Sequence, residues 1–368
     1  MLAGALTATM LAPAVANAAP MRDRAWVTVV ARGLDNPRGV TIGYDGAVVL
    51  AEAGRGGRSD RCVDSPEGGK VCLGLSGGIT AVSVGRRGAW SQRRIVGGLP
   101  SLAGRDGASA VGPHDVSPYG DREYVTALGL GGTPQSRFDL GLAGLMLGQT
   151  LIVRSDRNGQ STRSFGDPAA FEGRRDPDRQ GVDSNPYSIL GTRNGAVAVD
   201  AGGNTLLTIG QRGAVSTLAV FPNRMVAGPS GGRVSMQAVP TSVVRGPDGA
   251  FYVGQLTGFP FPVGGARVYR VVPGQQPTVV ARGFTNIVDI AFDRQGRLLV
   301  LEIAKNGLAS GDQTGALIRV DRRGNHTELV PGRLTAPGGL AVGADGSLFV
   351  TNHSTSAGRG ELLRIANV

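Results

Sequence analysis

The sequence predicts an all-β fold, a six-bladed β-propeller whose last blade is closed by a strand from the N-terminus. Three observations predict it. A tight turn followed by an apolar run recurs six times, further apolar runs precede and follow it, and the final copy lacks a fourth strand that the start of the chain supplies. The 368 residues include 60 glycines and 21 prolines, with 41% hydrophobic residues. Many short strands joined by many turns explain this composition.

The recurring turn is Asp-Gly, Asn-Gly or a related pair, which suits a two-residue hairpin because both central residues need a positive φ. It falls at residues 45–46, 120–121, 194–195, 248–249, 295–296 and 345–346. In five copies the strand before the turn begins at a proline, a position where the missing N–H costs least. The strand after the turn is followed by a third that starts near a glycine. We expect the proline-led strands to line the central channel.

The last copy stops after its third strand, at Val368. Its fourth strand is found in residues 26–34, where VVARGL closely matches VVARGF at 279–284. Splitting one blade between the termini leaves no long exposed edge between the first and last blades. We therefore expect residues 26–33 beside residues 361–366, in a single domain that spans residues 24–368.

Residues 1–18 read as a signal peptide that ends in Ala16-Asn17-Ala18, an A-x-A cleavage signal. This predicts a secreted, extracellular protein, and no other stretch is long and apolar enough for a membrane span. The net charge of +10 is carried almost entirely by arginines scattered among the turns, and aromatic residues make up only 5%. A nucleic-acid partner is not expected, because its binding surface would cluster basic and aromatic residues.

The two cysteines, Cys62 and Cys72, lie ten positions apart in a glycine-rich stretch. Export favours a disulfide between them, and the alternative is a pair of free thiols. No histidine stands nearby, so the pair does not suggest a zinc site.

The candidate site is the channel mouth where the proline-led strands begin. Aligning the six copies places asparagines on alternate blades and two aspartates on opposite blades, and their oxygens suit a hard cation such as Ca²⁺. The candidate ligand-binding residues are His114, Asp115, Asn185, Tyr187, Asn286 and Asp289. Asn185, Asn286 and Asp289 are the candidate metal ligands. The alternative is a polar channel filled with water.

The early copies carry four insertions, at residues 54–76, 98–112, 129–147 and 163–184. Long loops in a compact domain are often functional. The last insertion holds five acidic residues, which is unusual in a basic protein: Asp167, Glu172, Asp176, Asp178 and Asp183. It leads directly to Asn185, so we expect it to fold over the same face. A cap over the channel or a second cation site would follow, and the alternative is a solvated loop.

Several ordered motifs, among them PHDVS (113–117), GPDGAFYVGQLTGFPFP (246–262) and LAVGADGSLFVTN (340–352), resemble the ScyD/ScyE family over essentially the whole mature chain. The resemblance implies an NHL-like six-bladed propeller, among exported proteins of unassigned role, and brings no catalytic residues. More distantly the architecture is similar to the gluconolactonase/SMP-30 and strictosidine-synthase group. The SMP-30 metal set of Glu, Asn, Asn and Asp lacks its glutamate here, near Asn36.

Two functions are therefore carried forward. The first is a secreted binding protein that recognises a small molecule or a cell-envelope component at the channel face. The second is a metal-assisted lactonase, esterase or synthase-like enzyme that acts at the channel mouth. The first is favoured because no complete catalytic set is present in the sequence.

Overall fold

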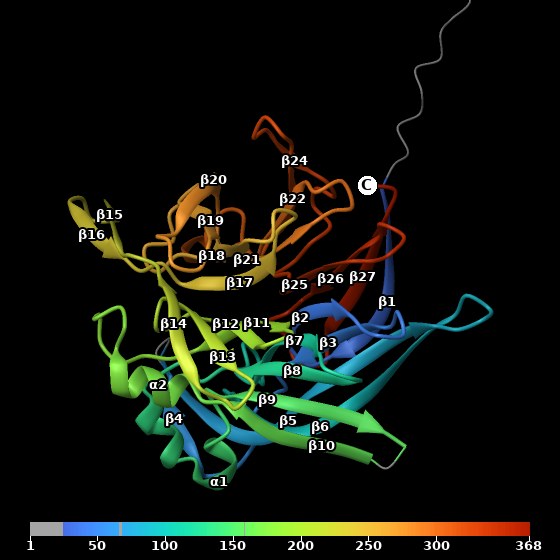
Figure 1. Cartoon of the computed structure of the whole chain (residues 1–368), viewed down its shortest axis with the longest axis horizontal. Helices are drawn as coiled ribbons and strands as arrows, with labels where there is room; N and C mark the ends of the chain where they lie inside the picture. Colours follow the sequence, from blue (N-terminus) through green and yellow to red (C-terminus); the bar gives the residue numbers. More distant parts are fainter. Residues whose placement is uncertain (1–24, 66–67, 158) are drawn as a thin grey trace, which may run out of the picture.

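The computed structural model describes residues 25–65, 68–157 and 159–368, and within these ranges the strands form six antiparallel sheets arranged around a centre (Figure 1). The predicted six-bladed propeller is confirmed. Each blade runs from an innermost strand at the channel to an outermost strand at the rim. A small hairpin, β15 (Arg224–Ala227) with β16 (Arg233–Met236), lies between the third and fourth blades in the sequence.

The first three blades follow the chain in order. Their strands, from the channel outward, are β2 (Pro37–Ile42), β3 (Val48–Glu52), β5 (Lys70–Val84) and β6 (Trp90–Ala103); then β7 (Pro113–Tyr119), β8 (Glu123–Leu128), β9 (Thr150–Asp156) and β10 (Gly159–Gly166); then β11 (Pro186–Thr192), β12 (Gly195–Asp200), β13 (Thr205–Gly210) and β14 (Val215–Val220). A short extra strand, β4 (Cys62–Asp64), pairs with β5.

The last three blades are more compact. Their strands, from the channel outward, are β17 (Pro240–Arg245), β18 (Phe251–Gln255), β19 (Ala266–Val271) and β20 (Thr278–Phe284); then β21 (Ile287–Phe292), β22 (Leu298–Glu302), β23 (Ala316–Val320) and β24 (His326–Glu328); then β25 (Gly339–Val342), β26 (Leu348–Asn352), β27 (Gly360–Ala366) and β1 (Trp26–Leu34).

The repeated turn works through both of its residues. Gly346 adopts a φ of +84°, a conformation that glycine takes without steric penalty. The preceding Asp345 accepts a hydrogen bond from the Ser347 backbone N–H at 2.9 Å, which fixes the return of the chain. The same aspartate-to-backbone bond recurs at Asp45 and Asp248. The turn that predicts the repeat is thus also the turn that builds it.

The ring closes as expected, because β1 pairs with β27 in antiparallel register, with Thr28 opposite Arg364. Figure 1 shows this N-terminal strand beside the C-terminal one. Leu34 of the closing strand shares a buried cluster with Leu50 of the first blade and Phe349 of the last. The closure therefore buries apolar surface as well as completing backbone pairing.

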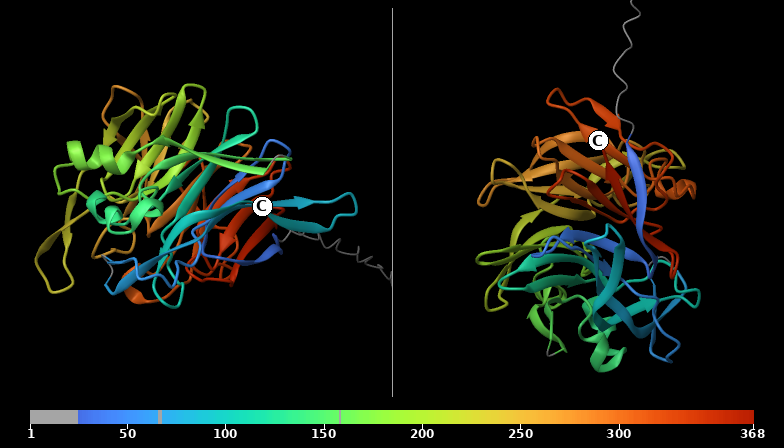
Figure 2. Two further views of the ribbon diagram at one scale, coloured as in Figure 1. Left: turned by 90° about the horizontal axis from the view of Figure 1, so that it is seen from below. Right: turned by 90° about the vertical axis from the view of Figure 1, so that its right-hand side faces the viewer.

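The four insertions do not form separate loops. The first two lengthen β5 and β6 beyond the strands expected from the repeat, and the others add α1 (Gly141–Gly144), a 3₁₀ turn η1 (Pro134–Phe138) and α2 (Pro168–Arg175). Figures 1 and 2 show β4, α1 and α2 gathered on one side of the propeller. One buried apolar cluster joins all four insertions: Leu73, Leu102, Leu130, Leu140, Leu147 and Ala169. We call this assembly the cap.

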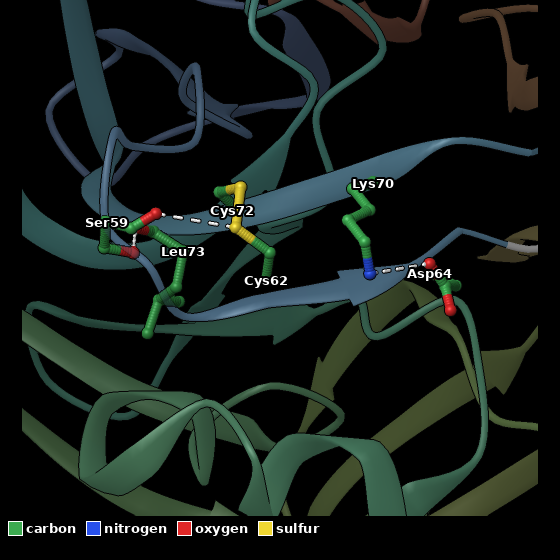
Figure 3. Close-up of a disulfide and its surroundings, with 6 residues drawn as sticks. All are labelled: Ser59, Cys62, Asp64, Lys70, Cys72 and Leu73. Carbon is green, nitrogen blue, oxygen red and sulfur yellow. Dashed lines mark hydrogen bonds and ion pairs between the residues drawn. A yellow bond between two sulfur atoms is a disulfide. The ribbon is translucent and has the colours of Figure 1, made fainter.

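The disulfide between Cys62 and Cys72 is present and joins β4 to β5 across a sequence separation of 10 residues (Figure 3). An ion pair of 3.1 Å between Lys70 Nζ and Asp64 Oδ1 lies next to it on the same hairpin. Because this hairpin supplies apolar side chains to the cap, the disulfide holds one edge of the cap in place.

The expected signal peptide, residues 1–18, lies outside the described residues. No helix within the described ranges has the length and apolar composition that a membrane crossing requires.

Candidate functional site

The innermost strands share an irregularity at the position that faces the channel. In five blades the register shifts directly after the first residue of the strand, as between Pro113 and Asp115 and between Ile287 and Asp289. Bulges of this kind re-aim the following side chain. The shift explains why the second residue after the proline position carries the two channel aspartates.

Asp115 and Asp289 each bind the edge of the next blade. Asp115 Oδ2 accepts bonds from Ser188 Oγ at 2.7 Å and from the Ile189 N–H at 2.9 Å. Asp289 Oδ2 accepts a bond from the Leu340 N–H at 2.7 Å. Each carboxylate also accepts the N–H of the residue that follows it. Both side chains therefore link neighbouring inner strands.

Burial weakens the ionisation of both aspartates. It raises the pKa of Asp115 to about 6, against the lowering effect of its hydrogen bonds. Burial raises the pKa of Asp289 well above its ordinary value, and the charge of Asp115 adds to the effect. The charge of Asp115 thus opposes the ionisation of Asp289, in addition to the effect of burial.

The two aspartates face one cavity of about 300 Å³ in the channel, which is lined by the inner strands of all six blades. Apart from the two acids most of the lining residues have apolar side chains, Val40, Val243 and Leu340 among them, but the surface they expose to the cavity is more polar than apolar. Side chains at the ends of the inner strands, such as Thr41, are half-buried, whereas those at their starts are buried. The cavity is thus reached from the turn end. The expected site lies at the opposite end, where these strands begin, and it stays a prediction.

The other four candidate residues do not line this cavity. His114 is 2% exposed, its ring centroid lies 4.8 Å from that of Tyr187, and its Nδ1 lies 3.3 Å from the Pro186 carbonyl oxygen. Burial lowers the pKa of His114 to about 3, with a further contribution from Arg38. This histidine is neutral and enclosed, which places it in the packing of the strand starts.

The asparagines are tied to neighbouring loops. Asn185 Oδ1 accepts the Leu130 N–H at 3.2 Å, and Asn286 Oδ1 accepts the Leu308 N–H at 2.9 Å. Asn286 and Asn36 both have a φ of +48°, a left-handed conformation that asparagine tolerates. Their side chains therefore have a structural explanation, and the metal set of Asn185, Asn286 and Asp289 stays a prediction.

Two further sets of residues recur at fixed positions in the blades. One set follows the prolines of the inner strands, and the other ends the second strands. Arg38, which is 8% exposed, follows the first proline and donates from Nη2 to the Ala110 carbonyl oxygen at 2.9 Å. Aligning the residue after each proline places Arg38, His114 and Tyr187 on consecutive blades. The second set ends the second strand of five blades with a polar side chain: Glu52, Asp200, Gln255, Glu302 and Asn352.

Four members of that second set form the same kind of hydrogen bond. Each accepts the backbone N–H of a residue just before the neighbouring inner strand, as from Asp35 to Glu52 at 2.7 Å and from Thr285 to Glu302 at 2.6 Å. They hold the chain where it enters the channel. The signal in the sequence is a polar residue at the end of each buried apolar run.

The acidic insertion produces the tightest group of carboxylates. Glu172, Asp176 and Asp178 each place an oxygen within 4.8 Å of the others, and among the described residues this is the group of acidic, histidine or cysteine side chains that could hold a cation. Asp167 is not part of it. That side chain caps α2 and forms a bidentate ion pair with Arg137, with both N–O distances at 2.9 Å.

Comparisons with known proteins support the fold. No protein-family model and no curated protein matches the chain. Among solved structures, an oxidoreductase (glucose dehydrogenase) of Thermus thermophilus has a TM-score of 0.54 at 16% identity, over 93% of this chain and 99% of that one.

Two other solved structures are similar to the same extent. A gluconolactonase of Xanthomonas campestris has a TM-score of 0.52 at 11% identity, over 94% of this chain and 90% of that one. The PQQ-bound aldose sugar dehydrogenase of Streptomyces coelicolor has a TM-score of 0.51 at 13% identity, over 94% and 100%. The distant likeness to gluconolactonase propellers is thereby supported, and at these identities it concerns the fold alone.

Proposed function

We propose that the chain is an exported binding protein that holds a small molecule in the central cavity, between Asp115 and Asp289. The observation that carries the proposal is the cavity itself, in which two opposed acids lie among residues supplied by all six blades. Its volume of about 300 Å³ is at the lower end of the range for small-molecule pockets.

The chemistry of the walls defines the class of ligand. Asp289 accepts two backbone N–H bonds, and an ionised carboxylate has room for about four. The remaining acceptor positions suit a ligand that carries N–H or O–H donors. A positive charge on the ligand would favour the ionised form of both acids, whose pKa values burial has raised. A small amine or amino sugar with an apolar face meets these requirements.

Export forms part of the proposal. The expected signal peptide and the disulfide of Cys62 with Cys72 both suit an oxidising compartment. The resemblance to exported ScyD/ScyE proteins agrees with it. Expression from the natural start, followed by fractionation and N-terminal sequencing, tests it. A chain that stays inside the cell with residues 1–18 attached contradicts export.

The enzyme alternative finds less support in the geometry. A lactonase-type reaction needs a metal with open positions or a base within reach of a nucleophile. The amide oxygens of Asn185 and Asn286 are engaged by backbone N–H groups, and His114 is enclosed. Assays of the purified protein on lactone and ester panels, with and without chelator, separate the two functions. Chelator-sensitive turnover contradicts the binding proposal.

Ligand binding is tested by calorimetry with a panel of primary amines and amino sugars beside neutral sugars of the same size. Thr41 lines the cavity at its accessible end, so Thr41→Arg should fill the space and repel a cation. Thr217 lies exposed on β14 at the rim, and Thr217→Arg is the matched control. We expect a cationic compound to bind the wild type and the control but not Thr41→Arg. Binding that survives Thr41→Arg would place the site elsewhere.

A further inference from the structure

Three carboxylates converge where α2 ends. Glu172 lies in the last turns of the helix, Asp176 is its C-cap with a φ of +40°, and Asp178 follows in the next turn. One oxygen from each lies within 4.8 Å of the others. The helix end and its turn thus bring together side chains that repel one another when they are ionised.

The environment of Glu172 points to a bound ligand. Its side chain is 2% exposed and forms no hydrogen bond with any described residue, and its Oε1 is fully buried. Burying an ionised carboxylate without a donor or a cation is strongly unfavourable. Oδ1 of Asp176 is also buried without a partner. Both residues belong to the group of three carboxylates that could hold a cation.

The surroundings add negative charge. Asp200, at the end of β12, and Asp183 both act on Glu172, and together with burial they raise its pKa to about 8. Within the described ranges no lysine or arginine forms an ion pair with Glu172, Asp176 or Asp178. The arginines that flank the helix end therefore leave this charge uncompensated.

The donor set and its size identify the ion. All the donors are oxygens, which excludes the soft metals and favours Ca²⁺ or Mg²⁺. Opposite ligands of Ca²⁺ stand about 5 Å apart, twice the Ca–O distance, and Mg²⁺ needs about 4 Å. The oxygens here all lie within 4.8 Å of one another, which fits inside a calcium coordination sphere. Several protein carboxylates around one ion are also typical of Ca²⁺, since Mg²⁺ usually keeps most of its water.

We propose that Glu172, Asp176 and Asp178 form a calcium site in the cap, separate from the central channel. The sequence from Asp176 to Gly181, DPDRQG, follows the first six positions of an EF-hand loop, with acids at the first and third and glycine at the sixth. It departs from that loop at the fifth, where the side-chain oxygen of Gln180 accepts a bond from Asn223 instead. The closing glutamate comes from the preceding helix, as Glu172.

Two residues link the site to the starts of inner strands. Asn204 donates from Nδ2 to Asp178 Oδ2 at 2.8 Å, and its Oδ1 accepts the Val239 N–H at 2.9 Å. Asp200, which faces Glu172, also accepts the Asn185 N–H at 2.6 Å through Oδ1 and the Ser184 hydroxyl at 2.6 Å through Oδ2. These two residues lead into β11. Calcium therefore stabilises the end of the cap against the propeller, rather than taking part in the chemistry of the cavity.

The purified full chain, stripped with EDTA, is titrated with CaCl₂ by isothermal calorimetry and is melted with and without the ion. We expect one calcium per chain and a higher melting temperature, with a smaller shift for MgCl₂. Glu172→Gln and Asp178→Asn should weaken calcium binding by about tenfold or more, since even groups that only support a metal ligand are worth about that much. Asp121→Asn, an exposed acid elsewhere, should bind calcium like the wild type.

Stability without calcium distinguishes a ligand from a structural residue. Glu172→Gln removes a charge from a crowded group, so in EDTA its melting temperature should equal or exceed that of the wild type. A drop in EDTA as large as the lost calcium response would make Glu172 merely structural and overturn the proposal. Wild-type protein that binds no calcium would also overturn it, as would calcium binding that is lost in Asp289→Ala and kept in Glu172→Gln. Should Glu172→Gln fail to fold, Asp178→Asn carries the same test.

Discussion

The channel acids are half-buried and Glu172 of the cap is buried, and the two kinds of acid differ in what surrounds them. Asp115 and Asp289 each receive backbone N–H groups from their own strand and from the next blade. Glu172 receives none within the described residues. A carboxylate that caps a strand edge is part of the architecture, whereas a carboxylate without donors requires a cation or a proton. The partners of a buried acid therefore say more about its role than its burial does.

The largest expected effect comes from removing a channel acid. Asp289→Ala leaves the Leu340 and Ile290 N–H groups in the channel without their acceptor. Each buried unsatisfied group costs about 1–3 kcal/mol, so we expect a loss of about 3 kcal/mol in the free energy of unfolding. Urea denaturation monitored by tryptophan fluorescence measures it.

The matched comparison is Glu172→Gln in the same titration, in EDTA, where no loss is expected. If Asp289→Ala is as stable as the wild type, the hydrogen bonds to the next blade do not hold the channel together, and the contrast between the two groups of acids fails.

A smaller loss of stability is expected when a glycine beside a channel acid, or beside a cap acid, is replaced by alanine. In Gly39→Ala the new Cβ would lie 2.9 Å from the Asp115 Cα and closer still to its carboxylate. Backbone cannot move aside, so we expect a loss of about 2 kcal/mol, typical of overpacking. In Gly203→Ala the Cβ would meet Glu172 Oε2 at 2.7 Å, the far end of a side chain that can shift.

Gly203→Ala should therefore cost less than about 1 kcal/mol in EDTA but weaken calcium binding, because the carboxylate is displaced. Parallel denaturation and calcium titration of both variants check this. If both variants lose the same stability, or if Gly203→Ala binds calcium as tightly as the wild type, then Asp115 and Glu172 do not differ in how firmly they are held.

The repeat made the fold predictable, since each blade carries its own copy of the turn. The closure followed from the likeness of residues 29–34 to 279–284, and β1 does pair with β27. The cap could not be predicted in the same way. Its core joins Leu73, Leu140 and Ala169 from three different insertions, and contacts between loops leave no period in the sequence.

The candidate site stays a prediction, and the repeat explains part of its geometry. Asp115 and Asp289 do face one cavity, because the repeat fixes which strand position points to the channel. The asparagines before the inner strands suggest ligands, yet Val239 and Ala336 at the same position share the left-handed backbone of Asn286. For Asn36 and Asn286 the asparagine thus follows backbone conformation, whereas Asn185 is not among the residues with a positive φ. Asparagine is common in such turns, so sequence alone does not separate the two explanations.

Glu302 has an intermediate environment: it accepts fewer hydrogen bonds than the channel acids and more than Glu172. It accepts one backbone N–H, from Thr285, and burial raises its pKa to about 7 from an ordinary value of 4.5. Blade four has Gln255 at the equivalent position, so a side chain of this size fits the repeat, although neither amide atom of Gln255 has a hydrogen-bond partner among the described residues. Glu302→Gln therefore removes the titration and keeps the acceptor.

Since the folded state holds the Glu302 proton more tightly than the unfolded state, the stability it contributes is complete below pH 4.5 and is lost as the pH rises through 7. At pH 4.5 the wild type and Glu302→Gln should be about equally stable, and at pH 8 the variant should be more stable, by at most about 3 kcal/mol. Lys305, which also pairs with Glu328, lowers the pKa of Glu302 and limits the difference. Urea denaturation at both pH values measures it. A variant that loses stability at pH 8 would mean that Glu302 is held as a satisfied carboxylate, like the acids that cap the strand edges.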